Sequence, residues 1–240
     1  MKWEFEYEEK TDSTLYALHA VAQHWIETEL IIENAALEEV EKNGPKWKPD
    51  GDDPDSIGEY FFEKSEARYL HDHVLIPMHR NSCIVMLCTT VEVELRRLLK
   101  NLESDFGPQK LSLKDIKGNS YLDTVSKFIE TFYNIQLSAC PDFLALHDLQ
   151  KIRDCIIHCL GEVALSRDSV YLIKLNKRRK GFFAHAQSDL NIGAECIEQF
   201  LIETWNFFIW VFNNLKWKIT TRNQGDKMKE MIKKLKPANT

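Results

Sequence analysis

The residues from Met78 to Leu102 read MHRNSCIVMLCTTVEVELRRLLKNL. Apolar side chains recur in this stretch at three- and four-residue spacings, at Ile84, Leu87, Cys88, Val91, Leu95, Leu98 and Leu99. That spacing is typical of a helix that packs one face on a core. Phe106-Gly107-Pro108 follows and interrupts the pattern, because glycine and proline end helices. The stretch therefore predicts a long core helix.

The same helical pattern dominates the rest of the chain. Further helices are expected over about residues 12–42, 57–73, 120–133, 143–160 and 194–218. Their ends carry ordinary signals: Asp12-Ser13 can cap the first helix, Pro141-Asp142 opens the helix from Phe143, and Gly161 ends it. Pro77 marks a boundary or a kink before the long core helix.

Short apolar runs lie between the last two long helices, at 163–165, 170–173 and 182–185. Their length and their β-branched and aromatic residues predict a small β-hairpin or a three-stranded flap. The expected fold class is therefore mainly α: an up-down helical bundle with a small β-hairpin appendage before the last long helix.

Composition narrows the class of protein. The chain has 240 residues, of which 44% are hydrophobic, enough for one sizeable core. No run of about 18 apolar residues is present, and the acidic start from Met1 to Glu6 lacks the pattern of a signal peptide, so no membrane association is expected. The six cysteines lie mostly in apolar helical stretches, which favours a reducing, cytoplasmic location.

The charge is distributed unevenly. Residues 1–63 hold 5 lysines and 17 acidic residues, a net of -12, which leaves +6 for residues 64–240 of the total of -6. This asymmetry suggests three segments: an acidic N-terminal helix and loop (1–56) on or beside the bundle, a helical domain (57–220) and a basic C-terminal tail (221–240). Basic residues of the C-terminal part allow a phosphate-bearing partner, and the acidic segment is a candidate for a built-in inhibitor that covers them.

The candidate chemistry lies in the helix that ends at Gly161. Arg153, Asp154 and His158 stand off its apolar stripe. Asp154 and His158 are i,i+4 neighbours, so the carboxylate can orient the imidazole, which can move protons near neutral pH. Arg153 lies about 140° round the helix from His158, so only its length lets it reach the same small anion. Its planar guanidinium can bind two phosphate oxygens at once.

The Arg-x4-His arrangement, with a polar residue directly after the arginine, resembles the signature of the HEPN superfamily. The resemblance covers roughly residues 69–218. It implies a helical bundle that dimerises through the motif helices, and many members are metal-independent endoribonucleases of toxin–antitoxin or other defence systems. On this chain it makes Arg153 and His158 the catalytic candidates and Asp154 the polar residue of the motif. The implied partners are RNA, a second copy of the chain and an antitoxin or regulatory protein.

The implied reaction is attack of an RNA 2′-hydroxyl on the adjacent phosphate, with His158 as general base or acid and Arg153 stabilising the developing charge. No cofactor and no metal is expected. Lys177, Arg178, Arg179 and Lys180 are candidate contacts to the RNA backbone, or they merely keep a hairpin soluble. One of Glu92 and Glu94 is a candidate support for Arg153, although ion pairs with Arg96 or Arg97 are the simpler expectation.

Each of these candidate residues also has an explanation in which it serves only the structure. Arg153 can pair with Asp154, and His158 can be a partly buried histidine without a functional role. His71-Asp72-His73 with His79 lacks a zinc-site spacing, and Cys155 and Cys159 are more typical of core residues than of metal ligands. The aromatic residues from Trp205 to Trp217 fit a core or dimer interface better than a base-stacking surface. The competing function is a non-catalytic HEPN-like dimer that binds a nucleotide, RNA or a protein partner.

Overall fold

The computed structural model describes residues 2–43, 45–49, 53–104, 116–118 and 120–217 of the chain. The basic tail at 221–240 and the Phe106-Gly107-Pro108 stop signal lie outside the described residues. Within them the protein is mainly helical, with a small two-stranded antiparallel sheet before the last helix, which confirms the expected fold class.

The long elements agree closely with the helical pattern of the sequence. The α-helices are α1 (Lys2–Asn43), α2 (Pro54–Leu70), α3 (Ile76–Ser104), α4 (Tyr121–Tyr133), α5 (Phe143–Cys159), α6 (Ser169–Leu175) and α7 (Ala194–Asn214). A π-helical turn, η1 (His71–Leu75), joins α2 to α3, so the boundary expected at Pro77 falls one residue into α3. Asp53 and Ser120 cap α2 and α4 with their side chains.

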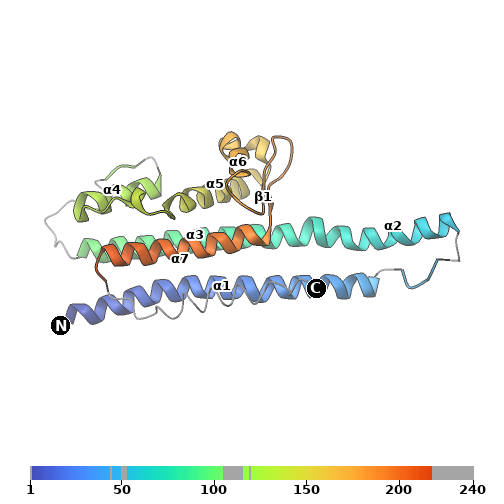
Figure 1. The fold of residues 1–240 in the computed structure, drawn as a ribbon, viewed down its shortest axis with the longest axis horizontal. Coiled ribbons are helices and arrows are strands. Elements are labelled where there is room, and N and C mark those ends of the chain that lie inside the picture. Colours follow the sequence, from blue (N-terminus) through green and yellow to red (C-terminus); the bar gives the residue numbers. More distant parts are fainter. Residues whose placement is uncertain (1, 44, 50–52, 105–115, 119, 218–240) are drawn as a thin grey trace.

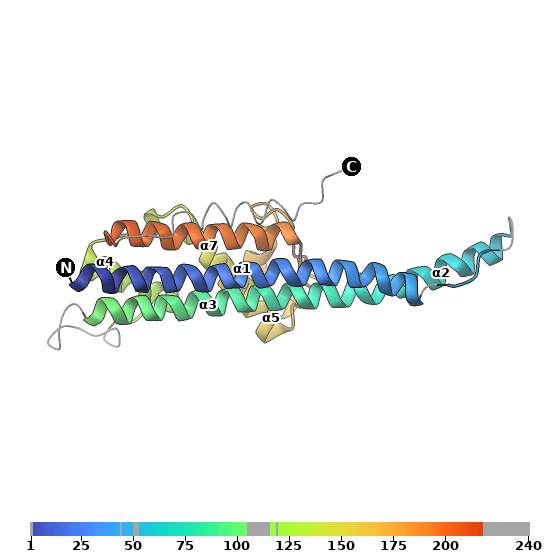
Figure 2. The same ribbon diagram turned by 90° about the horizontal axis from the view of Figure 1, so that it is seen from below.

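The helices form a long bundle in which α3 is central. It packs against α1 and α7 on one side and against α5 on the other (Figure 1). The view of Figure 2, turned by 90°, shows α1, α3 and α7 running side by side, whereas α2 continues the line of α3 beyond the bundle and folds back on the end of α1. The lobe that holds α6 and the β-hairpin sits over the end of α5, on the side away from α1.

The core is built by the apolar stripes of these helices. All seven apolar positions that defined the long helix in the sequence are buried in α3. From α1, the core receives Leu15, Leu18, Val21, Ala22 and Trp25. Burying five such side chains means that α1 belongs to the core of the bundle. A removable inhibitory segment is therefore the wrong description of it, because deletion would expose the face of α3 that it covers.

The expected flap is wrong in part. Val163–Leu165 is a 3₁₀ turn, η4, and Val170–Ile173 lies inside α6. Only the third run forms a strand: β1 (Phe182–Phe183) pairs with β2 (Asn191–Ile192), with Phe182 opposite Ile192. The helix prevails at 169–175 because it buries Leu172 and Leu175, three residues apart, on one face. Short apolar runs fit a strand or a helix, and tertiary packing decides between them.

One helical stretch of the described chain, His71–Glu103, is long and apolar enough to cross a membrane by length and composition, with a hydropathy of 1.3. Its buried side chains, among them Ile84, Leu87 and Leu95, face α1, α5 and α7. The core helix of a soluble protein meets the same criterion, and 28% of the apolar window is buried here, so a single such helix is weak evidence for a membrane span.

Candidate functional site

Helix α5 presents the predicted motif at its exposed end. Leu146, Leu149, Ile152 and Cys155 recur every third residue and are buried against the neighbouring helices. The helix ends with Leu160 at φ 54° and Gly161 at φ 88°, and the amide of Gly161 donates to the carbonyl of Cys155 at 3.1 Å. This left-handed C-terminal cap stops the helix at Cys159, one residue after His158. The motif residues thus occupy the face and the turn that the core does not use.

Arg153 and Asp154 form an ion pair at this end of α5. Nη1 of Arg153 donates to Oδ1 of Asp154 at 2.8 Å, and the two side chains are 28% and 35% exposed. The hydrogen bond with Asp154 raises the pKa of Arg153, and the carboxylate of Glu92 raises it further. Among the described residues nothing accepts from the buried Nε of Arg153. The pairing that the sequence allowed as a structural alternative therefore exists, and it leaves Nη2 without a hydrogen bond to any described residue.

His158 is exposed on the last turn of α5. In the part of the chain that the structure describes, its ring makes no hydrogen bond, so Asp154 does not orient it through a direct contact. Arg153 and His158 do not meet within one chain, as their angular separation on the helix requires. The structure thus places both candidate groups in reach of solvent, yet does not bring them together in a single copy.

The two glutamates on α3 differ in position. Glu92 is partly exposed, lies 3.9 Å from Arg96, and acts electrostatically on Arg153 across the α3–α5 contact. Glu94 is buried and binds the hydroxyl of Thr14 on α1 at 2.8 Å and Nη1 of Arg97 at 2.5 Å. Glu92 is therefore the glutamate that can support Arg153, whereas Glu94 joins α1 to α3.

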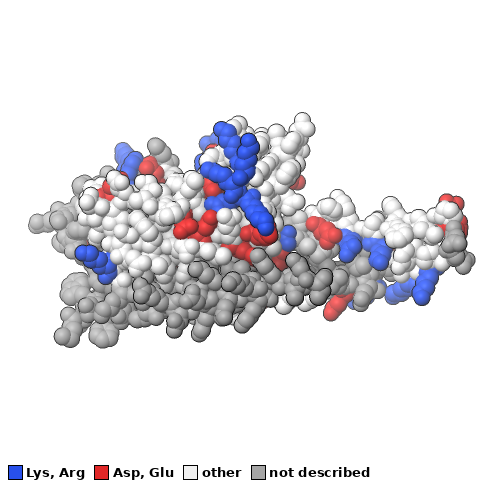
Figure 3. Space-filling model, viewed as in Figure 1, with Lys and Arg blue, Asp and Glu red and all other residues white. Residues whose placement is uncertain are grey.

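The four basic residues after α6 divide into two kinds. Lys177 and Lys180 are exposed, and Lys180 pairs with Glu195 at 2.9 Å. Basic side chains gather over the lobe that carries α6 and β1 (Figure 3). Arg178 is exposed but pairs with Asp148, and Arg179 is buried with the same carboxylate. An RNA contact by Arg179 is therefore the wrong expectation, because its guanidinium is held inside the protein.

A buried ionic cluster holds α5, the turn after α6 and α7 together. Asp148 accepts from Tyr171, Arg178 and Arg179, and Arg179 also pairs with Glu203 on α7. The guanidinium of Arg179 lies over the ring of Phe200, 4.4 Å from its centroid. Sequence reasoning missed this cluster. The available signal was the position of Asp148 next to Leu149 on the apolar side of α5, where an acidic residue needs a buried partner.

The histidines considered as metal ligands have other partners. His71 is buried and contacts Asp72 and the carbonyl of Ile32, whereas the ring of His79 stacks on Trp25 with 5.3 Å between centroids. No group of three or more possible ligands that could hold a metal ion occurs among the described residues. All six cysteines are free, and five of them, including Cys155, are buried.

The aromatic residues of α7 belong to the core. Phe207, Phe208 and Phe212 are fully buried and stack edge-on or tilted against one another, and Trp205 is nearly buried. This agrees with their interpretation as packing residues and leaves no base-stacking row on the described part of α7.

Comparisons of the chain with protein families, with curated proteins and with solved structures found no match.

Proposed function

We propose that the protein is a metal-independent endoribonuclease of the toxin or defence type, a HEPN-like protein that acts as a cytoplasmic homodimer. One observation carries this proposal: the solvent-accessible end of an otherwise buried helix presents a guanidinium, fixed by Asp154, and the imidazole of His158. The first can bind a phosphate and the second can move a proton near neutral pH.

In the proposed reaction, His158 takes the proton of the RNA 2′-hydroxyl as its oxygen attacks the adjacent phosphorus. The bond between phosphorus and the 5′-oxygen of the next nucleotide breaks, and that oxygen receives a proton from a histidine acting as acid. The second terminal nitrogen of Arg153 stabilises the charge on the phosphoryl oxygens. The products are a 2′,3′-cyclic phosphate and a 5′-hydroxyl end. No metal is required, since the nucleophile belongs to the substrate.

A second copy of the chain would complete this site. Arg153 and His158 diverge on one helix, so a single phosphate is served best by Arg153 of one protomer and His158 of the other. The surface around His158 favours such a contact, because Ile157 is 46% and Leu160 is 91% exposed. Exposed apolar residues grouped at one helix end are typical of interaction surfaces.

The Arg153–Asp154 ion pair also favours a second candidate function, a non-catalytic dimer that binds RNA, a nucleotide or a regulatory protein such as an antitoxin. Asp154 neutralises the cation that would bind phosphate and adds a charge that repels it. An RNA cleavage assay separates the nuclease from the binding dimer.

The experiment is an RNA cleavage assay in EDTA, with wild type, Arg153→Ala and His158→Ala. We expect each substitution to lower the rate by about a hundredfold or more, because loss of either a general acid–base group or a donor that stabilises the transition-state charge costs that much. The exposed Arg167 and His185 provide matched controls, and Arg167→Ala and His185→Ala should keep the wild-type rate. RNA left intact by the wild type at high protein concentration would refute the nuclease and leave the binding dimer.

The dimer is tested separately by sedimentation. Leu160→Asp places a charge in the proposed contact and should shift the protein from dimer to monomer without loss of helical content. A monomeric wild type at micromolar concentration, or a mutant that still dimerises, would contradict the proposed interface.

A further inference from the structure

A polar pocket of about 410 Å³ lies beside the end of α5. It opens between η1, the first turns of α3 and the segment that leads into β2, and Leu160, two residues after His158, is part of its wall. Its polar lining includes Asp72, Asn81, Asp189 and Asn191. The proposed cleavage site and this pocket are therefore neighbours on the same surface.

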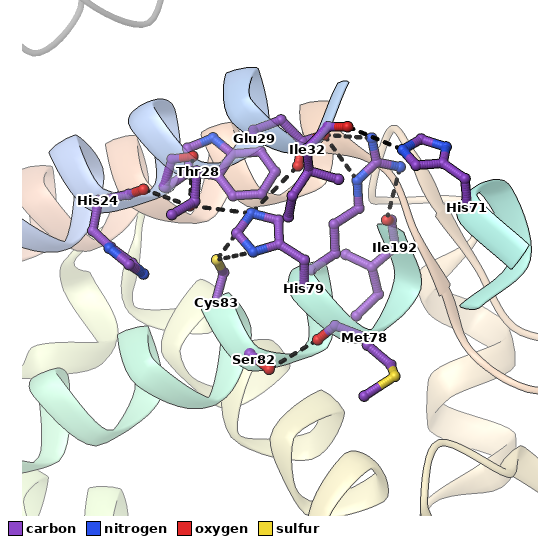
Figure 4. Close-up of polar contacts among 12 residues, drawn as sticks. His24, Thr28, Glu29, Ile32, His71, Met78, His79, Ser82, Cys83 and Ile192 are labelled. Carbon is purple, nitrogen blue, oxygen red and sulfur yellow. Dashed lines mark hydrogen bonds and ion pairs between the residues drawn. The ribbon is translucent and has the colours of Figure 1, made fainter. Parts of the chain in front are cut away.

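One side of the pocket is formed by Arg80, whose guanidinium is held in place by neighbouring groups. Arg80 donates to the buried Glu29 from Nε at 3.1 Å and from Nη2 at 2.6 Å, and its Nη1 reaches the carbonyl of Ile192 at 3.5 Å (Figure 4). His79 lies on the other side of the same carboxylate, 3.5 Å from it. These contacts use one N–H of each guanidinium nitrogen, and the carboxylate of Glu29 neutralises the charge, so Arg80 is a poor site for a ligand phosphate.

The remaining polar groups are two carboxylates, two amides and the exposed imidazole of His73, whose ring lies against Tyr69. Asp72 uses one carboxylate oxygen for His71 at 2.7 Å. The side chains of Asn81, Asp189 and Asn191 make no hydrogen bond or ion pair with any residue that the structure describes. Two carboxylates and two amides thus face a volume sufficient for a planar heterocycle. Asp72 belongs to η1, and such π-helical turns occur frequently at functional sites.

We propose that this pocket binds an unpaired guanine of the RNA substrate and so sets where the chain is cut; the inference rests on the proposed ribonuclease function. The Watson–Crick edge of guanine presents two adjacent N–H donors, which one carboxylate accepts together, and an O6 acceptor for an amide N–H. Uracil presents two carbonyl acceptors and a single donor, which two carboxylates would repel.

The position of the pocket agrees with that role. The main chain between His158 and Leu160 spans at most about 7 Å, so a base in the pocket belongs to a nucleotide next to the phosphate that His158 serves. With Arg80 held by Glu29, the lining offers no further permanent cation for the phosphates of a free nucleotide. A guanine base whose backbone is bound elsewhere, by Arg153, fits the charges better than free GMP or GTP.

The first test uses nucleosides, which need no cleavage. Calorimetry with guanosine and uridine on the full-length protein should show binding of guanosine at least about tenfold tighter than that of uridine. Asp189→Asn and Asp72→Asn should each weaken guanosine binding, whereas Glu59→Gln, an exposed acid on α2, should not. Equal binding of the two nucleosides, or guanosine binding that survives both aspartate substitutions, would refute the proposal that this pocket binds guanine.

The second test maps cleavage of oligouridine strands that carry one guanosine, adenosine or cytidine. Cuts are expected beside guanosine, and Asp189→Asn should spread them over the strand. Cleavage without base preference in the wild type would refute guanine binding by the pocket and leave the ribonuclease proposal standing. Guanosine binding without any cleavage would refute the ribonuclease and leave guanine binding standing.

Discussion

Arg179 donates two hydrogen bonds to one carboxylate oxygen of Asp148, from Nε at 3.0 Å and from Nη2 at 2.9 Å. The two side chains are 5% and 1% exposed, so neither charge is solvated by water. Glu203 on α7 is the second acidic partner of the same guanidinium. Arg179 therefore joins two carboxylates, and Arg178, 3.1 Å from the other oxygen of Asp148, is the second cation of the cluster.

Arg179→Met should destabilise the fold by about 3–5 kcal/mol, because removing one partner leaves buried charges uncompensated. Urea unfolding at neutral pH measures this free energy. Lys177→Met removes the exposed neighbour and should leave the unfolding midpoint unchanged. A stable Arg179→Met protein would mean that Arg178 and Tyr171 alone satisfy Asp148.

This cluster illustrates what the sequence could and could not provide. The run from Lys177 to Lys180 looks like one basic patch, since nothing local distinguishes the buried arginine from its exposed neighbours. The distinction depends on Asp148 and Glu203, which are distant in sequence and adjacent only after α5 and α7 have packed. Pairings of this kind depend on tertiary structure, which no local pattern contains.

The sequence predicts the long helices better than the segment between α5 and α7, because the fold of that segment depends on tertiary packing. The spacing that defined Met78–Leu102 depends on which residues face a core, and α3 buries those positions. The run at 170–173 is too short for its spacing to separate a strand from a helix. The start of the first helix was also misplaced, because Asp12-Ser13 satisfies a capping rule but lies inside α1, which begins at Lys2.

The stability of the bundle should fall on mild acidification through His79. Burial, with His24 and Arg80 nearby, lowers the pKa of His79 below its ordinary value of 6.5, although Glu29 lies 3.5 Å away. Below pH 6.5 the unfolded chain binds a proton that the folded protein takes up only at lower pH. The stability contribution is therefore complete above 6.5 and is lost as the pH falls through the lowered value.

Unfolding free energies at about pH 7.5 and about pH 5.5 test this dependence. His79→Gln should lose less stability between the two than the wild type does. His185→Gln, at an exposed site, should keep the wild-type difference. An unchanged difference in His79→Gln would assign the acid sensitivity to another group, with the half-buried His147, whose pKa burial also lowers, as the next candidate.

The N-terminal helix should be indispensable for folding. Leu18 on α1 is 1% exposed, and Leu18→Ala should cost about 2–5 kcal/mol, the range for a buried leucine truncated to alanine. Tyr16→Ala, two residues away at a side chain that is 68% exposed, is the matched control and should cost little. Urea unfolding compares the two, and an equal response would mean that α1 is only loosely attached.

Asp154 should act as a positioning residue for the proposed cleavage. Its carboxylate holds Nη1 of Arg153 at 2.8 Å, which fixes the direction of the second terminal nitrogen. Asp154→Ala should lower kcat by about 10- to 100-fold, because a guanidinium displaced by about 1 Å loses that much transition-state stabilisation. KM should not rise, since the guanidinium that attracts RNA remains and the carboxylate that repels it is gone.

Asp154→Asn separates positioning from repulsion of the substrate. It keeps an oxygen that can accept from Arg153 and removes the negative charge beside the phosphate site. If position is what matters, Asp154→Asn retains most of the wild-type kcat and binds RNA more tightly at low salt, where electrostatic attraction is strongest. If both variants cleave as fast as the wild type, Arg153 needs no anchor, and the ion pair at the end of α5 stabilises the helix without a role in cleavage.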